Sequence, residues 1–505
     1  MKQETTRGAE RPHPRREPRL PLPLSPEGLE QVFDGCADLQ KRQVRLAGSP
    51  ERQVTVYWLA GMAKTERIND YVFRPLAQDG QLARAEPAEL LALLTRGALY
   101  AQQATAEGEM DKVALALIDG ACALFLPEQP GTAVVVPVPT EEKRSVGEPE
   151  SEPPLKGARD SFVESVRTNT SLVRRRLRAP ELKIGERIVG RQSLTPVDVL
   201  WLDGIADPDT VARIRARLDD IDIDGVEAAG NIEEYVTDRV DTPFPLMSYT
   251  QRPDRFCQGL LEGRVGLLCD GLALGYLLPG TVDQFFKTGQ DRAYHWLLAS
   301  MLSLVRYLCA GVTLLVPGLY IALVTYHPEA IPVKLALSIV SAKQEVPFST
   351  MFEVLILLFA FEVLQEAGLR LPAPIGATVS ILGGLVVGNA AVDARIVSPA
   401  VLIAVAIAGV AGYTMPSQDF AGALRLWRFL LAVLASLGGL FGLGLGCALL
   451  LYHLAGLETF GVPYLAPFTS GGGRRTGHPT VVRPPLGEMK WRDGALCSRN
   501  RRNQR

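Results

Sequence analysis

The chain has 505 residues, which allows roughly two to four domains of ordinary size. Its 53 Lys and Arg residues nearly balance its 55 Asp and Glu residues, so charge does not indicate a nucleic-acid-binding protein. The seven cysteines are scattered and the five histidines lie far apart, which argues against a disulfide framework and against a metal site. We expect no cofactor.

The first part of the chain is an arm followed by an α/β subdomain. Residues 1–28 are rich in Pro, Arg and Glu and predict a disordered arm. They lack the apolar segment of a signal peptide, so we expect residues 29–138, the first α/β subdomain, to face the cytoplasm. Its expected elements are a strand at 53–60, a helix at 65–73 that ends before Pro75, and two strands, 113–118 and 122–126, joined by an Asp-Gly turn.

A second α/β subdomain follows a linker. The composition of residues 139–158 is that of a linker, and the α/β pattern resumes over 159–290. The expected elements there are a helix at 160–177, a strand at 197–202, a helix at 207–218 and a hairpin of 264–269 with 272–278.

The two subdomains repeat each other in sequence. VTVYWLAG at 54–61 matches VDVLWLDG at 197–204, and DKVALALIDGACALFLP at 111–127 matches EGRVGLLCDGLALGYLLP at 262–279. The offsets are about 143 and about 151 residues, which predicts two related folds. The alternative is coincidence, because strand–Gly–helix and Asp-Gly patterns are common.

Residues 291–455 predict an all-α, polytopic membrane domain. Apolar runs of spanning length occur at 296–324, 375–392, 399–415 and 427–451. Two segments, 332–342 and 352–364, are too short to cross unaided and predict partial or re-entrant helices. The tail, 456–505, is basic and favours the cytoplasmic side, so both ends lie inside and the number of crossings is even.

One apolar stretch carries carboxylates at Glu353, Glu362 and Glu366. A carboxylate is costly in lipid unless it faces protein or water. Two interpretations stay open: the carboxylates line a cation path or an inter-subunit contact, or Glu362 bonds a neighbouring helix and Glu366 ends the helix in water.

Small residues and prolines surround this stretch. Small residues at intervals of four form two rows: Gly376, Ser380, Gly384 and Gly388 make the first, and Gly438, Gly442 and Gly446 the second. Such rows would allow close packing of helices, either within one bundle or between copies of the chain. Prolines at three positions predict hinges: Pro347, Pro372 and Pro374.

A basic run after the linker comprises Arg174, Arg175, Arg176 and Arg178. It is either the solvated face of a helix or a contact with anionic headgroups or a partner. The sequence shows no phosphate-binding loop and no nucleophile with a matching base, which argues against an enzyme.

Several long segments between residues 160 and 470 resemble the A-type subunit of the GerA family of spore germinant receptors. They include SFVESVRTNTSLVRRRLRAPELK, DVLWLDGIADPDTVARIRARLDDIDIDGV, EVPFSTMFEVL, EVLQEAGLRLPAPIGATVSILGGLVVGNAAVDARIVSP and PYLAPF. The resemblance implies a multi-pass protein of the spore inner membrane that works with a transporter-like B subunit and a lipoprotein C subunit. It also implies a response to nutrients that ends in ion release, through an A subunit that forms a homo-oligomeric, ion-conducting assembly in lipid.

The chain departs from the family at Ala377 and Asn389 and in its tail, where residues 471–505 match nothing expected and suggest disorder. The alternative function is a secondary transporter of a small solute, but such proteins usually have more spans or clear inverted repeats.

Overall fold

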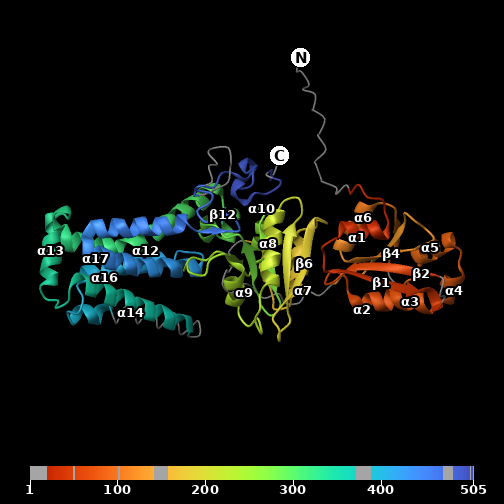
Figure 1. Ribbon diagram of the computed structural model, residues 1–505, viewed down its shortest axis with the longest axis horizontal. Helices are drawn as coiled ribbons and strands as arrows, with labels where there is room; N and C mark the ends of the chain where they lie inside the picture. The colour runs from red at the N-terminus through yellow and green to blue at the C-terminus, as the bar shows by residue number, and fades with distance from the viewer. Residues whose placement is uncertain are drawn as a thin grey trace, which may run out of the picture.

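The computed structural model describes residues 20–48, 52–100, 103–140, 157–370, 388–469, 481–500 and 502–503. Figure 1 shows an elongated molecule with the first α/β subdomain at one end, the second in the middle and a group of long helices at the other end.

The first subdomain is an antiparallel sheet covered by helices on both faces. The sheet order is β1-β2-β4-β5-β3, with β1 Leu39–Arg45, β2 Gln53–Leu59, β3 Thr105–Glu107, β4 Ala121–Phe125 and β5 Ala133–Pro137. One face packs on α1 Pro26–Val32 and α6 Met110–Ile118, and the other on α2 Thr65–Ile68, α3 Arg74–Gln78, α4 Gly80–Arg84 and α5 Pro87–Arg96. Successive side chains of β2 alternate between the two cores, as the two-residue period of a strand requires: Val56 enters one and Tyr57 the other.

The second subdomain has the same architecture. Its order is β6-β7-β9-β10-β8, with β6 Leu182–Val189, β7 Thr195–Leu202, β8 Ser248–Thr250, β9 Val265–Cys269 and β10 Gly275–Leu278. One face carries α7 Val166–Arg176 and α10 Pro253–Glu262, and the other carries α8 Pro208–Asp219 and α9 Ala229–Val236. The N-cap of α8 is Asp207, whose carboxylate accepts the backbone N–H of Thr210 at 3.0 Å.

The structure confirms the repeat but corrects its alignment. Equivalent strands β3 and β8 begin at Thr105 and Ser248, about 143 residues apart, and helices α6 and α10 begin at Met110 and Pro253, again about 143 apart. The offset of about 151 was wrong because it aligned two Asp-Gly pairs that have different structural roles. Gly120, at φ 90°, ends helix α6, whereas Asp270-Gly271 joins β9 to β10.

Three local predictions are corrected. Residues 113–118 belong to helix α6, whose buried side chains include Met110, Val113, Ala114, Leu117 and Ile118 at helical spacing. The helix at 65–73 does not stop before Pro75, because a π-helical turn, η2 Asn69–Phe73, leads into α3. Pro75 lies in the first turn of α3, where the missing N–H of proline is tolerated. The helix expected at 160–177 is shorter, Val166–Arg176.

The basic run joins the two subdomains. Arg174 on α7 is 1% exposed and binds the equally buried Asp38 through two nitrogens, with Nη2 to Oδ1 at 2.8 Å. Backbone contact adds to the joint, since Ala37 donates to the Ile184 carbonyl at 2.7 Å. The solvated-face interpretation is therefore wrong at Arg174, although Arg178 pairs with Asp119 at the surface.

The helical part contains five long or apolar helices among the described residues. They are α12 Trp296–Tyr326, α13 Val333–Lys343, α14 Thr350–Arg370, α16 Pro399–Gly412 and α17 Gln418–Ala455. By length and composition two of these, α12 and α17, could cross a membrane, and α16 is a shorter apolar helix. α14 has 21 residues, about 32 Å at helical rise, so it is longer than the segment expected at 352–364. Most of the span expected at 375–392 lies outside the described residues.

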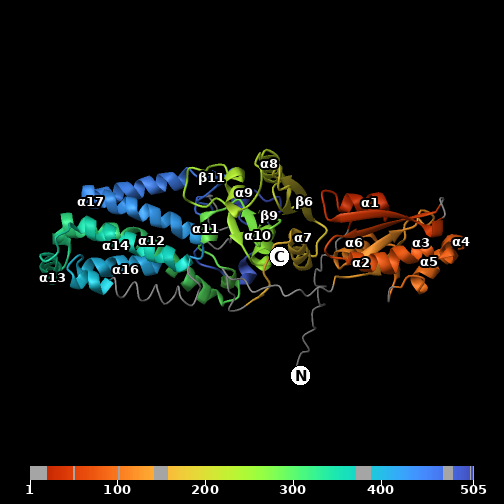
Figure 2. The same ribbon diagram turned by 90° about the horizontal axis from the view of Figure 1, so that it is seen from below.

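Helix α17 is a hairpin of two antiparallel arms. Gly439 breaks it with φ 59° and ψ −137°, a conformation open almost solely to glycine. Trp427 and His453 lie in ring contact at 5.7 Å, whereas a straight helix would separate them by about 39 Å. The arms lie side by side in Figures 1 and 2. The single span expected at 427–451 is therefore wrong.

Disorder was expected for residues 1–28 and 471–505, but residues 20–28 and 481–500 pack against the rest of the protein, and residues 1–19 lie outside the described part of the chain. In the arm, Leu20 donates its N–H to Asp111 at 2.7 Å and Leu24 is buried, so residues 20–28 belong to the first subdomain. In the tail, β11 Glu458–Thr459 and β12 Val462–Pro463 form a hairpin, and η5 Leu486–Glu488 and η6 Gly494–Leu496 follow. Arg492 donates to the Leu261 carbonyl at the end of α10, at 2.6 Å.

Candidate functional site

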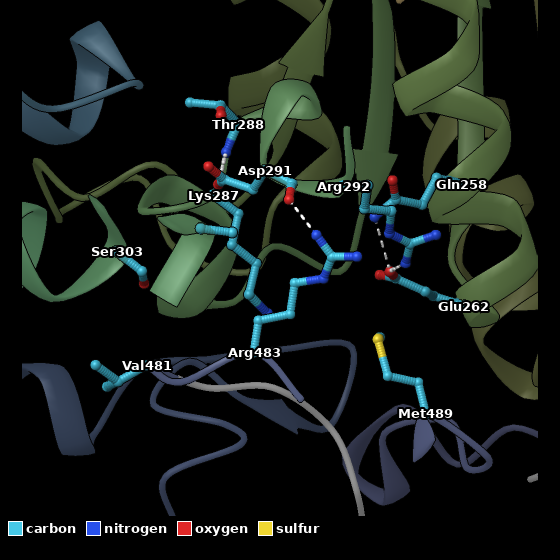
Figure 3. Close-up of a pocket in the computed structure, with 11 residues that line it drawn as sticks. Gln258, Glu262, Lys287, Thr288, Asp291, Arg292, Ser303, Val481, Arg483 and Met489 are labelled. Atoms are coloured by element: carbon cyan, nitrogen blue, oxygen red, sulfur yellow. Dashed lines mark hydrogen bonds and ion pairs between the residues drawn. The ribbon is translucent and has the colours of Figure 1, made fainter. Parts of the chain in front are cut away.

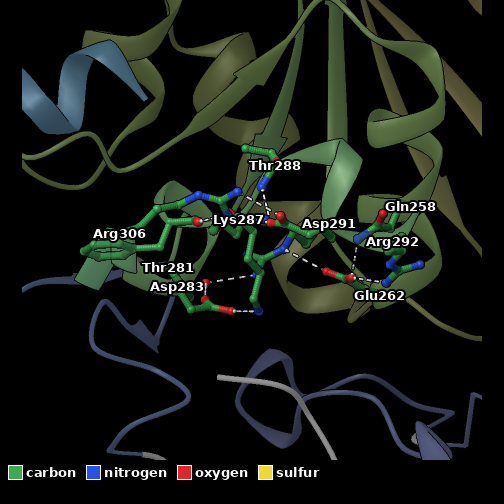
Figure 4. Close-up of polar contacts among 12 residues, drawn as sticks. Gln258, Glu262, Thr281, Asp283, Lys287, Thr288, Asp291, Arg292 and Arg306 are labelled. Carbon is green, nitrogen blue, oxygen red and sulfur yellow. Dashed lines mark hydrogen bonds and ion pairs between the residues drawn. The ribbon is translucent and has the colours of Figure 1, made fainter. Parts of the chain in front are cut away.

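An ion pair joins the second subdomain to the first long helix. Arg306, in α12, holds the Asp291 carboxylate through two hydrogen bonds of 2.7 and 2.9 Å and also donates to the Phe286 carbonyl at 2.9 Å (Figure 4). Asp291 lies in the short helix η3 Gly289–Arg292 and accepts the Thr288 N–H at 2.8 Å in a capping box. One carboxylate thus caps η3 and anchors α12.

Two further ion pairs flank this one. Lys287 pairs with the buried Asp283 at 2.5 Å, and Thr281 donates to the same carboxylate at 2.6 Å. On the other side, Arg292 donates to Glu262 of α10 at 2.9 Å (Figure 4). The charges at this junction are therefore largely compensated in pairs, as buried charges must be.

Aromatic rings complete the junction. The ring of Phe286 stacks on Tyr307 of α12 with centroids 4.0 Å apart, and Phe285 of α11 Val282–Phe285 stacks on Phe420 of α17 at 5.7 Å. Tyr464, fully buried, packs against Phe285. The start of α12, the start of α17 and the segment after α17 therefore meet one subdomain.

The tail lies across the same junction. The Arg483 guanidinium donates to the carbonyl of Asp291 (Figure 3) and to that of Tyr294. The backbone N–H of Arg483 donates to the Ser300 hydroxyl at 3.0 Å. Burial, with the nearby Arg292 charge, lowers the pKa of Arg483. The tail around Arg483, which was expected to be disordered, thus contacts both η3 and α12.

The predicted acidic residues lie on α14 but do not share one environment. Glu353 is fully buried, and its Oε2 accepts the N–H of Ser398, the N-cap of α16, at 2.7 Å. A carboxylate at a helix N-terminus is favourable because of the helix dipole. Its other oxygen has no partner among the described residues.

Glu362 faces the first arm of α17. It pairs with Arg425 at 2.9 Å and lies 3.7 Å from Arg428, whose side chain is 4% exposed. A cavity between α14, α16 and α17 is lined by all three residues. Glu366 is exposed, one turn further along α14. The structure therefore places the three carboxylates in three settings.

The described small residues pack mainly within this chain. A side chain at Gly442 would meet the Leu434 carbonyl, and one at Gly446 would meet Leu431, both on the opposite arm of the hairpin. Gly388 faces Leu402 of α16. Pro347 lies between α13 and α14. The remaining members of the predicted set, Gly376, Ser380, Gly384, Pro372 and Pro374, lie outside the described residues.

Sequence reasoning missed the junction. Arg306 was visible as the one charge in a long apolar run, which is the signal that could have marked it. Its partner Asp291 carries no local pattern. Among the described residues, no three His, Cys, Asp or Glu side chains come together as a metal site.

Comparison with known proteins identifies the family. The profile of the "Bacillus/Clostridium GerA spore germination protein" family matches residues 27–495. The chain belongs to the GerA family. Its membership and its apolar helices together indicate a membrane protein of spore germination.

Individual GerA-family relatives are similar in sequence to this protein over most of its length. The "Uncharacterized membrane protein YfkQ" of Bacillus subtilis (strain 168) is 36% identical over 95% of this chain and 93% of its own length. "Spore germination protein KA" of the same organism is 32% identical over 90% of this chain and 85% of its own. The crystal structure of the N-terminal domain of the A subunit of the Bacillus megaterium spore germinant receptor GerK3 matches 50% of this chain and 91% of its own, with 25% identity and a TM-score of 0.38.

Proposed function

We propose that this protein is the A subunit of a spore germinant receptor that converts nutrient recognition into ion release across the spore inner membrane. It would act with a transporter-like B subunit and a lipoprotein C subunit. Family membership supports the receptor role, and the junction at Asp291 and Arg306 supports the conversion step.

The junction carries the argument because it is both buried and polar. Asp291 and Arg306 are each at most 13% exposed on their side chains and are held by two hydrogen bonds. Charge-assisted hydrogen bonds in such surroundings are stronger than neutral ones and fix geometry. A change in the second subdomain at η3 is thus passed to α12 rather than absorbed by a flexible linker.

The path of the chain supports an even number of crossings. α12 begins beside the second subdomain, and Phe460, which follows α17, enters that subdomain's core. Both ends of the helical part meet the same subdomain. In this proposal the α/β part and the tail therefore lie on one side of the bilayer, the side that faces the spore core.

The helices would assemble with other copies around an ion path. Large apolar side chains on α14, α16 and α17 are exposed, among them Phe359, Ile403, Leu437 and Phe441. Such a surface requires lipid or protein contact. In this proposal Glu362, half-exposed between α14 and α17, and Glu366 would meet ions or a second copy, whereas Glu353 is engaged with α16.

The test is germinant-triggered cation release from spores with normal receptor levels. We expect Glu362→Gln to slow release several-fold, since neutralising it leaves Arg425 and Arg428 without their carboxylate. The matched control is Glu329→Gln, because Glu329 is 72% exposed and lies in the short helix η4 Pro328–Ala330 that follows α12. Release that is unchanged in both Glu362→Gln and Glu366→Gln would contradict the path.

A further inference from the structure

A small cavity lies beneath the tail at the junction. It is bordered by α10 and η3 of the second subdomain, by α12 and by the tail (Figure 3). Its volume is about 60 Å³. Polar and apolar residues both line it, and the apolar ones are Ala299, Val481 and Met489.

The charges around this cavity leave one cation over. Arg292 is paired with Glu262, Lys287 with Asp283, and Arg306 with Asp291. Arg483 is the remaining charge. Among the described residues no carboxylate oxygen lies within ion-pair distance of its guanidinium, which donates instead to two backbone carbonyls.

The position of Arg483 makes this excess costly. The residue is 9% exposed, and its Nε–H has no hydrogen-bond partner among the described residues. A buried cation that has no carboxylate of its own is energetically unfavourable, and an unmade hydrogen bond adds to that cost. An anion in the cavity would remove both deficits.

We propose that the cavity binds a small monoanionic carboxylate, held by the Nε–H of Arg483, with its short alkyl body against Ala299 and Met489. A single negative charge matches the single uncompensated cation. A dianion such as phosphate would place excess negative charge near Glu262 and offers no apolar body to the lining. This site goes beyond the proposed receptor role and does not depend on it.

The location gives the ligand a mechanical consequence. The cavity is lined by Glu262 of α10, Asp291 of η3, Ser303 of α12 and Arg483 of the tail. A bound carboxylate therefore ties the tail to the two elements that the Asp291–Arg306 pair already joins. Its occupancy would stiffen the junction.

The test is calorimetric titration of the purified full-length protein in detergent with sodium propionate. We expect saturable binding of propionate, and none of propylammonium, which has a similar body and the opposite charge. Arg483→Gln should weaken binding at least about tenfold, the loss of one charge-assisted hydrogen bond. Arg499→Gln is the matched control, since Arg499 is an exposed arginine of the same tail.

A second variant tests whether Arg483→Gln loses binding only because it displaces the tail. Ser303→Leu keeps every charged group but fills the cavity, and it should also abolish propionate binding while circular dichroism stays native. Saturable phosphate binding without propionate binding would overturn the carboxylate assignment. Absence of any anion binding, or equal propionate binding by the Arg483→Gln variant, would overturn the site.

Discussion

Single buried charges in this chain connect parts that are far apart in sequence. Arg174 binds Asp38 across the two α/β subdomains, and Arg306 binds Asp291 across the α/β–helix junction. Neither pair lies in a sequence motif from which the pairing could be predicted. Sequence could therefore predict that an arginine in an apolar run needs a partner, but not which carboxylate the fold brings to it.

Breaking the Arg174–Asp38 pair should expose its energetic role. Arg174→Met or Asp38→Leu alone leaves a buried charge unpaired and should lower the free energy of unfolding by about 3–5 kcal/mol. The double variant should cost much less than the sum. A double-mutant cycle from chemical denaturation measures this, and additive losses would contradict direct pairing.

Asp198 should make stability depend on pH. Burial raises the pKa of this carboxyl to about 6, against the lowering effect of Arg167, and its Oδ1 has no partner among the described residues. A folded-state pKa above the unfolded value of about 3.8 means that stability is lost as pH rises from about 4 to 6.

The Asp198→Asn variant removes this loss. Its free energy of unfolding should exceed that of the parent by about 1–3 kcal/mol at pH 7.5 and differ little at pH 4. Denaturant unfolding at the two pH values measures the difference. An equal effect at both would show that ionisation of Asp198 is not responsible.

At the scale of elements, the most consequential departure from expectation is the hairpin in α17. The sequence from 418 to 455 has no proline and reads as one apolar helix, so its pattern could not reveal a reversal. Tyr326 fixes the turn from α12, with its hydroxyl donating to the Ser436 carbonyl at 2.6 Å. Helix α6 was missed for a related reason: a short apolar run fits a strand as well as a helix.

Two adjacent glycines allow a matched test of the hairpin. Gly439→Ala should destabilise the protein by about 1–3 kcal/mol, because its backbone has φ 59° and a Cβ would lie 3.0 Å from Tyr326. Gly438→Ala should be nearly neutral, since the nearest atom to a Cβ there is 3.9 Å away. Thermal unfolding in detergent compares them, and equal midpoints would argue against the reversal.

At the scale of the whole molecule, sequence predicted the order of the parts, and the structure shows how they are joined. The repeated α/β subdomains followed from matching strands, because β7 keeps the pattern of β2 at an offset of about 143 residues. The junction and the docked tail did not, since Asp291, Arg306 and Arg483 meet only after folding. Of the predicted carboxylates, Glu353 and Glu362 are brought to neighbouring helices, on α16 and α17.

The central claim is that the second subdomain transmits its state to the helices through Arg306. The most direct test is germinant-triggered cation release from spores that carry Arg306→Gln at normal receptor level. A coupling of about 1–3 kcal/mol predicts release slowed at least about fivefold. The control is Arg191→Gln, which removes a surface pair of the same subdomain. If Arg306→Gln spores release cations as fast as the parent and control do, the junction does not carry the signal.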